Sequence, residues 1–482
     1  MARIDEFAPQ MVQLHTQTQD HPLPSTTPFK IQEPNNTQFQ IQPTRGLFFR
    51  KLFRNLFYIH FFLITILVIV LTIRGLVSAA TNHHFRPLEW FPPLLASTAC
   101  AGIFSFAWQS FTLYNPSRTL KAAFWLGPLL TCAVGIFLVS IGSSRSLAPA
   151  VIALVSSIVL SLYSCWVSPQ FDHAIKVLSI STAFPPPRTT MLVVLTIISC
   201  TLYSSFMVAG IGGATATGTV FDSIFILVLL LSLAWTMQVI KYTLQVTISR
   251  VKYMNFASGT ELDINVAFRD TLKHSLGSIC VGSALVPILG LIQGSARALS
   301  LISGDTDEFL FSCANCYSEV GSRLITYANR WGFVYAGAYN MGFVQASIDT
   351  WEMFRRGGLE QVIDSDLTSS FCFLSGMASG AVCALLGGSW CLVVHKGYAA
   401  EISIYAYLIG YFMCRVAMAW PQACVSAYLV AYAENPQHPR FDSTIPVRIQ
   451  ELQRSRTQTS QITHFTDHLA EAEAEAEATI SH

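Results

Sequence analysis

Residues 147–167 read LAPAVIALVSSIVLSLYSCWV, and none of these side chains is charged. A helix that crosses a membrane needs about 20 mostly apolar residues in a row. Because hydrocarbon offers no hydrogen-bond partners to an exposed backbone, such a run crosses a bilayer as a helix. This stretch therefore predicts a membrane protein, and the rest of the chain decides how many such helices it has.

Nine further stretches are predicted as membrane helices, and they differ in strength. Five are as clear as the first: 57–79, 94–114, 122–141, 191–211 and 220–240. Two more are confident, and a third, long one is interrupted at Pro421; these are residues 276–293, 371–394 and 402–433. Residues 331–348 are a weak candidate because Gly, Asn and Gln recur in them, and a buried or re-entrant helix is the alternative. The sequence thus predicts an all-α fold, a polytopic membrane helix bundle with about ten transmembrane helices.

Composition excludes several classes of protein. Of the 482 residues, 52% are hydrophobic and 12% are charged, against roughly a quarter charged in ordinary soluble domains. A net charge of +1 gives no field that favours nucleic acid. There is no nucleophile elbow, phosphate-binding glycine loop or histidine cluster at metal spacing, so we predict no catalytic residue, no metal and no cofactor. Cys313 and Cys316 form a CxxC pair without the second pair that zinc needs, and we expect at most a strained disulfide there.

Basic residues beside the spans orient the chain. The cluster at 45–54 precedes the first span and places the N-terminal side in the cytosol. Ten spans also place the C-terminal tail in the cytosol, whereas nine place it outside. We expect a disordered polar tail at 1–46, a transmembrane transporter domain at 47–434, and a disordered tail at 435–482 with an acidic Glu-Ala stretch. The first tail lacks the apolar core of a cleavable signal peptide, so we expect the first span to serve as the insertion signal.

Four stretches in the second half of the chain carry recognisable motifs. They are WTMQVIK at 235–241 with VTI at 246–248, SLGSICVGS at 275–283, NRW at 329–331 followed by Tyr335, Tyr339 and DTW at 349–351, and IDSDL at 363–367 leading to Gly376. In order and spacing they resemble the choline transporter-like family, in its fungal and plant-type branch. The resemblance implies a ten-helix transporter of choline or a related small organic cation in the plasma membrane, with both termini cytosolic. The family usually has glycine where this chain has Asn340.

Two other functions stay open at this point. One is a non-transporting membrane scaffold or lipid-linked interaction protein of the same fold, which uptake of labelled choline separates from a transporter. The other is a channel, which saturation and turnover rate separate from a carrier. We expect a choline-like cation and the lipid bilayer as partners, expect no nucleic acid, and leave the oligomeric state unknown.

Recognition of a quaternary ammonium group requires aromatic faces and diffuse negative charge, because this group has no N–H to donate. Tyr335 and Tyr339 are four residues apart and share one helix face. The alternative interpretation is that such aromatic residues belong to the membrane interface or the core. We take as substrate-binding candidates Trp235, Gln238, Tyr242, Tyr335, Tyr339 and Arg415.

Ionisable and small residues add further predictions. Arg415 lies within a span, where a charge either faces the bundle interior or has a purely structural partner. Lys241 lies near the cytosolic end of its span, and we expect it to snorkel to the interface. Small residues on helical spacing let helices approach closely. We predict a tight helix-packing seam, or one that slides during transport, at Gly277, Ser278, Gly282 and Ser283.

Overall fold

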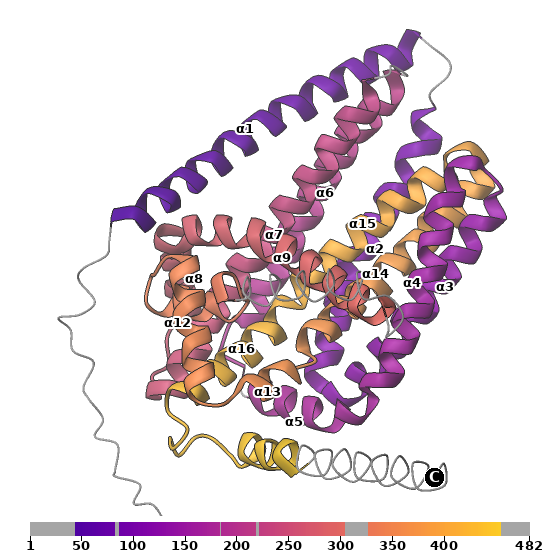
Figure 1. Cartoon of the computed structure of the whole chain (residues 1–482). Helices are drawn as coiled ribbons and strands as arrows, with labels where there is room; N and C mark the ends of the chain where they lie inside the picture. Colours follow the sequence, from indigo (N-terminus) through magenta and orange to yellow (C-terminus); the bar gives the residue numbers. More distant parts are fainter. Residues whose placement is uncertain (1–43, 82–85, 184, 218–220, 304–325, 455–482) are drawn as a thin grey trace, which may run out of the picture. The chain divides into compact units, whose positions relative to one another are not determined.

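The computed structural model describes residues 44–81, 86–183, 185–217, 221–303 and 326–454. Every regular element in these ranges is a helix, which confirms the predicted all-α fold (Figure 1). Cys313 and Cys316 lie outside the described residues. The helices are, in chain order, α1 (Thr44–Thr81), α2 (Pro87–Tyr114), α3 (Pro116–Ile141), α4 (Ser144–Val167), α5 (Phe171–Thr182), α6 (Thr189–Thr217), α7 (Asp222–Ser258), α8 (Ile264–Asp270), α9 (Leu276–Ser303), α11 (Gly332–Ala338), α12 (Phe343–Arg356), α13 (Glu360–Asp364), α14 (Thr368–Val394), α15 (Ala399–Ala417) and α16 (Ala419–Glu434), with the short turns η1 (Ser168–Gln170), η2 (Thr271–Ser275) and η4 (Lys396–Tyr398) between them.

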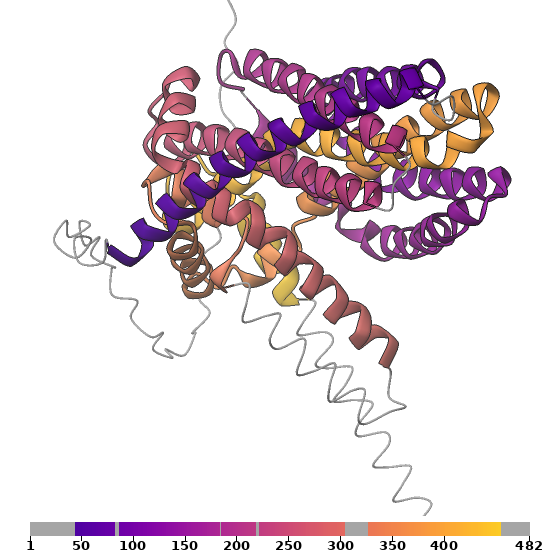
Figure 2. The same cartoon turned by 90° about the horizontal axis from the view of Figure 1, so that it is seen from above.

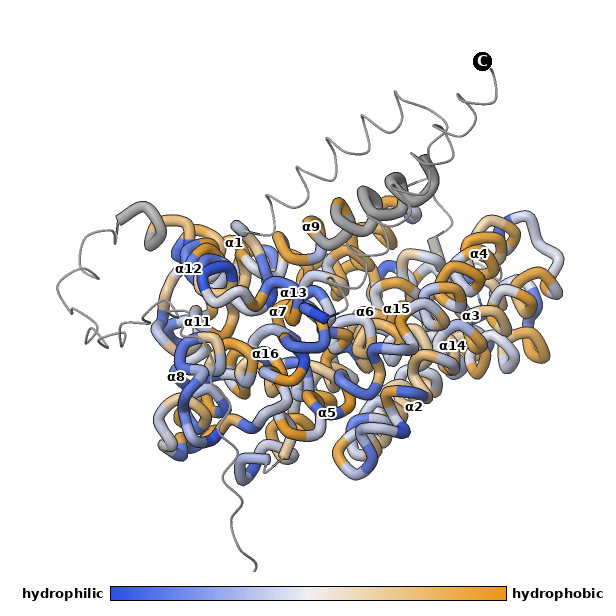
Figure 3. Tube along the Cα trace, turned by 60° about the horizontal axis from the view of Figure 1, so that its bottom comes forward, coloured by the Kyte–Doolittle hydropathy of each residue, from blue (hydrophilic) through white to orange (hydrophobic). Residues whose placement is uncertain are grey.

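The apolar helices carry their hydrophobic side chains on the outside as well as inside. Within the described ranges, eight helical segments are long and apolar enough to cross a membrane, and a ninth is formed if α15 and α16 count as one bent span. On α4, Ile152 is 67% exposed and Leu162 is 66% exposed. Figure 3 shows hydrophobic residues along α3 and α4, and hydrophilic residues gathered around α8, α12 and α13. Exposed apolar faces of this kind are satisfied by lipid rather than water.

The weak tenth candidate, residues 331–348, does not form one long helix. It is divided between α11, with 7 residues, and α12, with 14 residues, and each is shorter than the roughly 17 residues that a span needs. The two helices pack against each other, and Phe333 and Val334 of α11 are fully buried. The helix is broken at the turn between them, where Asn340 has a φ of 55°. This stretch is therefore two short helices rather than one span, and α11 is the part of it that is mostly buried.

The predicted interruption near Pro421 separates α15 from α16, which are bent by 41° relative to each other. Proline has no N–H to donate, and its ring clashes with the carbonyl group four residues earlier, here that of Ala417. Accordingly, α15 ends at Ala417 and α16 begins at Ala419, so the bend lies before the proline rather than at it.

Helix α7 is surrounded by other helices. It packs against α6, α8, α9, α11, α15 and α16. Its 37 residues make a rod about 55 Å long, well beyond the roughly 30 Å of the hydrocarbon core. All side chains from 241 to 249 are buried. The second half of α7 therefore lies inside protein, where polar side chains can be held away from lipid.

The start of α1 and the end of α16 meet at the turn between α11 and α12. Nη1 of Arg50 donates to the carbonyl oxygen of Asn340 at 2.9 Å, and the hydroxyl of Tyr339 donates to Oε1 of Glu434 at 3.1 Å. At its other end α1 approaches α6, where Gly75 faces Gly213 (Figures 1 and 2). The start of α1 and the end of α16 thus lie near the same turn.

Candidate functional site

A cavity of about 280 Å³ lies between α4, α9, α12, α14 and the segment that precedes α11. Three aromatic side chains line it, those of Tyr163, Trp331 and Trp351. Two carboxylates, those of Asp364 and Asp366, belong to the same lining. We call this space the tryptophan cavity. Aromatic faces next to carboxylates are the surroundings that attract an organic cation.

The cavity is built from motifs that are far apart in the sequence. Trp331 comes from the NRW motif, Trp351 from the DTW motif, and Asp364 and Asp366 from the IDSDL motif. The centroids of the two tryptophan rings are 6.5 Å apart. Two of the four quoted stretches, the third and the fourth, thus contribute to one space, although spacing alone gave no sign of it.

Asn329 holds the first tryptophan in place. Its Nδ2 donates to the carbonyl oxygen of Ser347 at 2.8 Å, and its Oδ1 accepts from the backbone N–H of Gly332 at 2.9 Å. The second bond satisfies a free N–H at the start of α11, while the first ties this start to α12. A Cβ atom at Gly332 would lie 2.4 Å from Oγ of Ser347, so glycine is required for this close approach.

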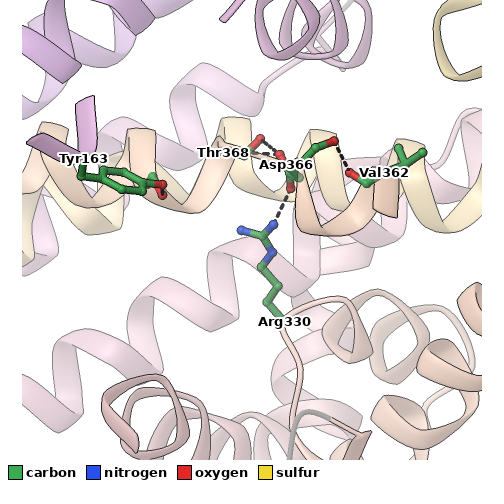
Figure 4. A network of polar contacts seen from close by, with 7 residues as sticks. Tyr163, Arg330, Val362, Asp366 and Thr368 are labelled. Atoms are coloured by element: carbon green, nitrogen blue, oxygen red, sulfur yellow. Dashed lines mark hydrogen bonds and ion pairs between the residues drawn. The ribbon is translucent and has the colours of Figure 1, made fainter. Parts of the chain in front are cut away.

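Arg330 and Asp366 form an ion pair at the edge of the cavity (Figure 4). Their side chains are 12% and 8% exposed. Asp366 also accepts from the backbone N–H of Thr368 at 2.9 Å and from its hydroxyl at 2.6 Å, at the start of α14. The guanidinium of Arg330 lies 4.5 Å from the centroid of the Trp331 ring. One face of Trp331 is therefore already occupied by a cation of the protein, and Asp366 is largely neutralised.

None of the six predicted substrate-binding residues lines the tryptophan cavity. The structure does bring Tyr335 and Tyr339 together, with ring centroids 5.1 Å apart in edge-to-face contact. Tyr253 of α7 lies against both, at 6.4 and 6.1 Å. The hydroxyls of Tyr253 and Tyr339 both donate to Glu434. We call these four residues the tyrosine cluster.

The tyrosine cluster contains two members that sequence reasoning did not select. Tyr253 and Glu434 are 181 residues apart, and no local pattern joins them. Burial raises the pKa of the hydroxyls of Tyr335 and Tyr339. Both hydroxyls therefore stay protonated near neutral pH and can keep donating to their partners.

Two other aromatic candidates already have their ring faces covered. Tyr242 stacks on Phe333 with centroids 4.2 Å apart and is buried. Trp235 lies 4.7 Å from the ring of His60, and its Nε1 donates to Oγ of Ser283 at 3.2 Å. Neither residue shares a pocket with Tyr335 and Tyr339 among the described cavities.

Each of the two polar candidates has buried side-chain atoms without a hydrogen-bond partner. Oε1 of Gln238 and both Nε and Nη1 of Arg415 are buried and unpaired. The expectation that Lys241 snorkels is wrong, because its side chain is 1% exposed and its Nζ has no hydrogen-bond partner. The reason is the length of α7, which continues to Ser258 and is covered by neighbouring helices beyond the apolar stretch.

The four small residues of α9 approach four different neighbours. A Cβ atom at Gly277 would lie 2.3 Å from the carbonyl oxygen of Arg50. One at Gly282 would lie 2.5 Å from the ring of Phe333. The hydroxyl of Ser278 donates to the carbonyl oxygen of Met341 at 2.9 Å, and Ser283 accepts from Trp235. These contacts are close; sliding along them during transport stays a prediction.

The sequence of the chain matches one family of known proteins. The profile of the family described as plasma-membrane choline transporter matches residues 151–437, which is more than half of the chain and contains every residue of the tryptophan cavity. The chain belongs to the choline transporter family. This confirms the resemblance drawn from the four motifs and makes the chain an integral membrane protein of a transporter-type family.

Curated relatives of this choline transporter family member come from fungi. Protein PNS1 of Mycosarcoma maydis is 29% identical over 182 residues, which cover 35% of this chain and 34% of the relative. Protein pns1 of Aspergillus fumigatus is 24% identical over 181 residues, covering 36% and 34%. Protein PNS1 of Gibberella zeae is 23% identical over 216 residues, covering 42% and 40%. The matches thus span about a third to two fifths of these relatives.

Proposed function

We propose that this chain carries choline or a related small quaternary amine across the plasma membrane. The observation that supports this most is the tryptophan cavity, where Tyr163, Trp331 and Trp351 lie with Asp364 and Asp366 inside the part of the chain that matches the family. Its volume of about 280 Å³ is at the small end of ligand pockets, which suits a small solute.

The lining suggests how such a solute is held. Because Arg330 covers one face of Trp331, the ammonium group lies against Trp351 and the remaining face of Trp331. Asp364 supplies negative potential, which a permanent cation requires, because Asp366 is already paired with Arg330. Ser369 and Ser370 complete the polar side of the lining, and the hydroxyl of Tyr163 is 2.6 Å from Oγ of Ser370. These hydroxyls serve the hydroxyl end of choline.

Uptake of labelled choline by cells that express the chain tests the proposal. A cation–aromatic contact is worth about 0.5–2 kcal/mol, so Trp351→Ala should raise KM by about 2- to 30-fold. Trp351→Phe keeps a ring face and should raise it less. Trp125→Ala is the matched control, since Trp125 of α3 is exposed and lies outside the cavity. Equal KM values for Trp351→Ala and Trp125→Ala, at equal surface expression, would reject the cavity as the substrate site.

The same assay addresses the rival function. A parent chain that reaches the cell surface and takes up no choline above background favours a non-transporting scaffold. Uptake that rises linearly with choline and never saturates favours a channel instead of a carrier.

A further inference from the structure

Among the residues that the structure describes, two cationic side chains, those of Lys241 and Arg415, lie inside the bundle and form no ion pair with a carboxylate. Lys241 of α7 is 1% exposed, and its Nζ lies 4.5 Å from the centroid of the Tyr242 ring. Arg415 of α15 has two buried nitrogens, Nε and Nη1, with no hydrogen-bond partner. Gly376 of α14 lies directly against the side chain of Arg415. The helices that carry the two cations, α7 and α15, pack against each other.

The side chains that interact electrostatically with Lys241 and Arg415 do not neutralise their positive charges. The other charged residue that acts on Lys241 is Arg330, itself a cation and already paired with Asp366. The remaining groups are thiols and phenols, at Cys372, Cys414, Tyr242 and Tyr411. In the described part of the chain, no carboxylate is among them. Burying an ion without a partner costs several kcal/mol, so each of these buried cations needs a counter-charge.

Further polar groups without partners lie beside Lys241. Gln238 precedes it by three residues and Gln245 follows it by four, so all three share one face of α7. Oε1 of Gln238 and both Oε1 and Nε2 of Gln245 are buried and unpaired. The amide nitrogen of Gln245 therefore adds an unused N–H donor to those of Lys241 and Arg415. Several buried donors around two positive charges are what an anion requires.

We propose that Lys241 and Arg415 together bind one small anion between α7 and α15. Chloride from solution and the anionic group of a zwitterionic solute share this chemistry. The site is separate from the tryptophan cavity, because neither Lys241 nor Arg415 lines that cavity. The inference therefore holds whether or not choline binds at Trp351, and a failed choline assay leaves it unaffected.

The experiment measures the melting temperature of the purified full chain in detergent while chloride replaces gluconate at constant ionic strength. A ligand that binds the folded state stabilises it progressively above its Kd. The melting temperature of the parent should rise with the logarithm of the chloride concentration. Lys241→Met and Arg415→Met should abolish that rise. In a parallel arm, phosphocholine and glycine betaine are added in gluconate; if the anion belongs to the solute, they raise the melting temperature and chloride does not.

Lys252→Met is the matched control for a lost lysine. Lys252 is also buried on α7, but its Nζ donates to the carbonyl oxygen of Ala183 at 2.7 Å. This variant should lose stability yet keep the anion dependence of the parent. The proposal is overturned if neither chloride nor either zwitterion raises the melting temperature of the parent. It is also overturned if Lys241→Met and Arg415→Met respond to anions as Lys252→Met does. A parent that responds to none of these anions overturns the proposal even where a variant cannot be purified.

Discussion

The guanidinium of Arg330 pairs with the carboxylate of Asp366 and joins the segment before α11 to the start of α14 (Figure 4). This pair connects two motifs that are separated by a third one, and it fixes one wall of the tryptophan cavity. Both side chains are mostly buried. Removing one partner from a buried pair leaves an uncompensated charge, whereas removing both leaves none.

The first prediction follows from that asymmetry. Arg330→Met and Asp366→Asn should each lower the free energy of unfolding by about 3–5 kcal/mol, and the double variant should lose clearly less than the sum. Arg356→Met is the control, because Arg356 pairs with Glu352 at an exposed position of α12, where pairs are worth about 0–1 kcal/mol. Denaturation of the purified variants measures all four. If the double variant loses as much free energy of unfolding as the two single variants together, Arg330 and Asp366 are not coupled.

The second prediction concerns Gly277, where α9 approaches α1. A Cβ atom there would lie 2.3 Å from a backbone carbonyl oxygen of Arg50, which cannot move without moving α1. Gly277→Ala should therefore destabilise the protein by about 1–3 kcal/mol, the usual cost of overpacking. At Gly357 an added Cβ would meet only ordinary contacts, the nearest at 3.4 Å. Gly357→Ala should change the melting temperature little, and equal effects of the two variants would show that the close approach is absent.

The third prediction concerns Asn340, whose φ of 55° lies in the left-handed region. Most residues pay about 1–2 kcal/mol there, while glycine pays nothing and asparagine pays little. Asn340→Gly should leave stability unchanged or raise it slightly, in keeping with the glycine usual in the family. Asn340→Ala should lower stability by about 1 kcal/mol. The bond from Arg50 is to the backbone oxygen of residue 340, so neither change removes it. If Asn340→Ala melts at a higher temperature than Asn340→Gly, the left-handed backbone at residue 340 does not strain an alanine.

Hydropathy predicted the positions of the membrane helices because each is a contiguous apolar run. It could not predict where the helices end. For α7 the apolar run fades near residue 240, yet the helix continues to Ser258 because α8, α11 and α16 cover it. That difference explains the wrong expectation for Lys241. A tertiary contact decided the burial of this residue, and no window along the sequence contains that contact.

The same limit applies to the candidate sites: local spacing predicted some of their contacts, and tertiary contacts determined the others. Helical spacing correctly put Tyr335 beside Tyr339, since the four-residue interval is a local property. Trp331 and Trp351 stood in quoted motifs but were not selected as site residues, because they lie on opposite sides of the turn at 339–342. Glu434 was missed because its partners are 95 and 181 residues away. Contacts between residues that only the tertiary fold brings together could not be predicted from the sequence.

The fourth prediction tests the tyrosine cluster as a second place for the cation, next to the carboxylate of Glu434. Tyr339→Ala and Tyr335→Ala remove a ring face that attracts an ammonium group, whereas the Phe variants keep it. Choline uptake should therefore fall more in the Ala variants than in the Phe variants. Tyr339→Phe also loses the hydrogen bond to Glu434, so a small effect is expected from it. If all four variants transport like the parent, these tyrosines only pack the ends of α7 and α16.

The fifth prediction concerns the driving force of the proposed transport. A permanent cation moved without a coupling ion gains about 2.3 kcal/mol per 100 mV of membrane potential, enough for roughly fiftyfold accumulation inside. Labelled choline uptake should therefore collapse when cells are depolarised with potassium and an ionophore. It should continue when sodium is replaced by a large organic cation that the chain does not carry.

The proposed anion site at Lys241 and Arg415 gives the depolarisation test two distinct outcomes. If the site only balances the two buried charges, transport still moves one net positive charge and stays sensitive to the potential. If each cation instead crosses together with one anion, transport is electroneutral and the potential contributes nothing. Uptake that persists on depolarisation and falls when gluconate replaces chloride would contradict the uniport prediction, and would mean that the anion is carried with the solute.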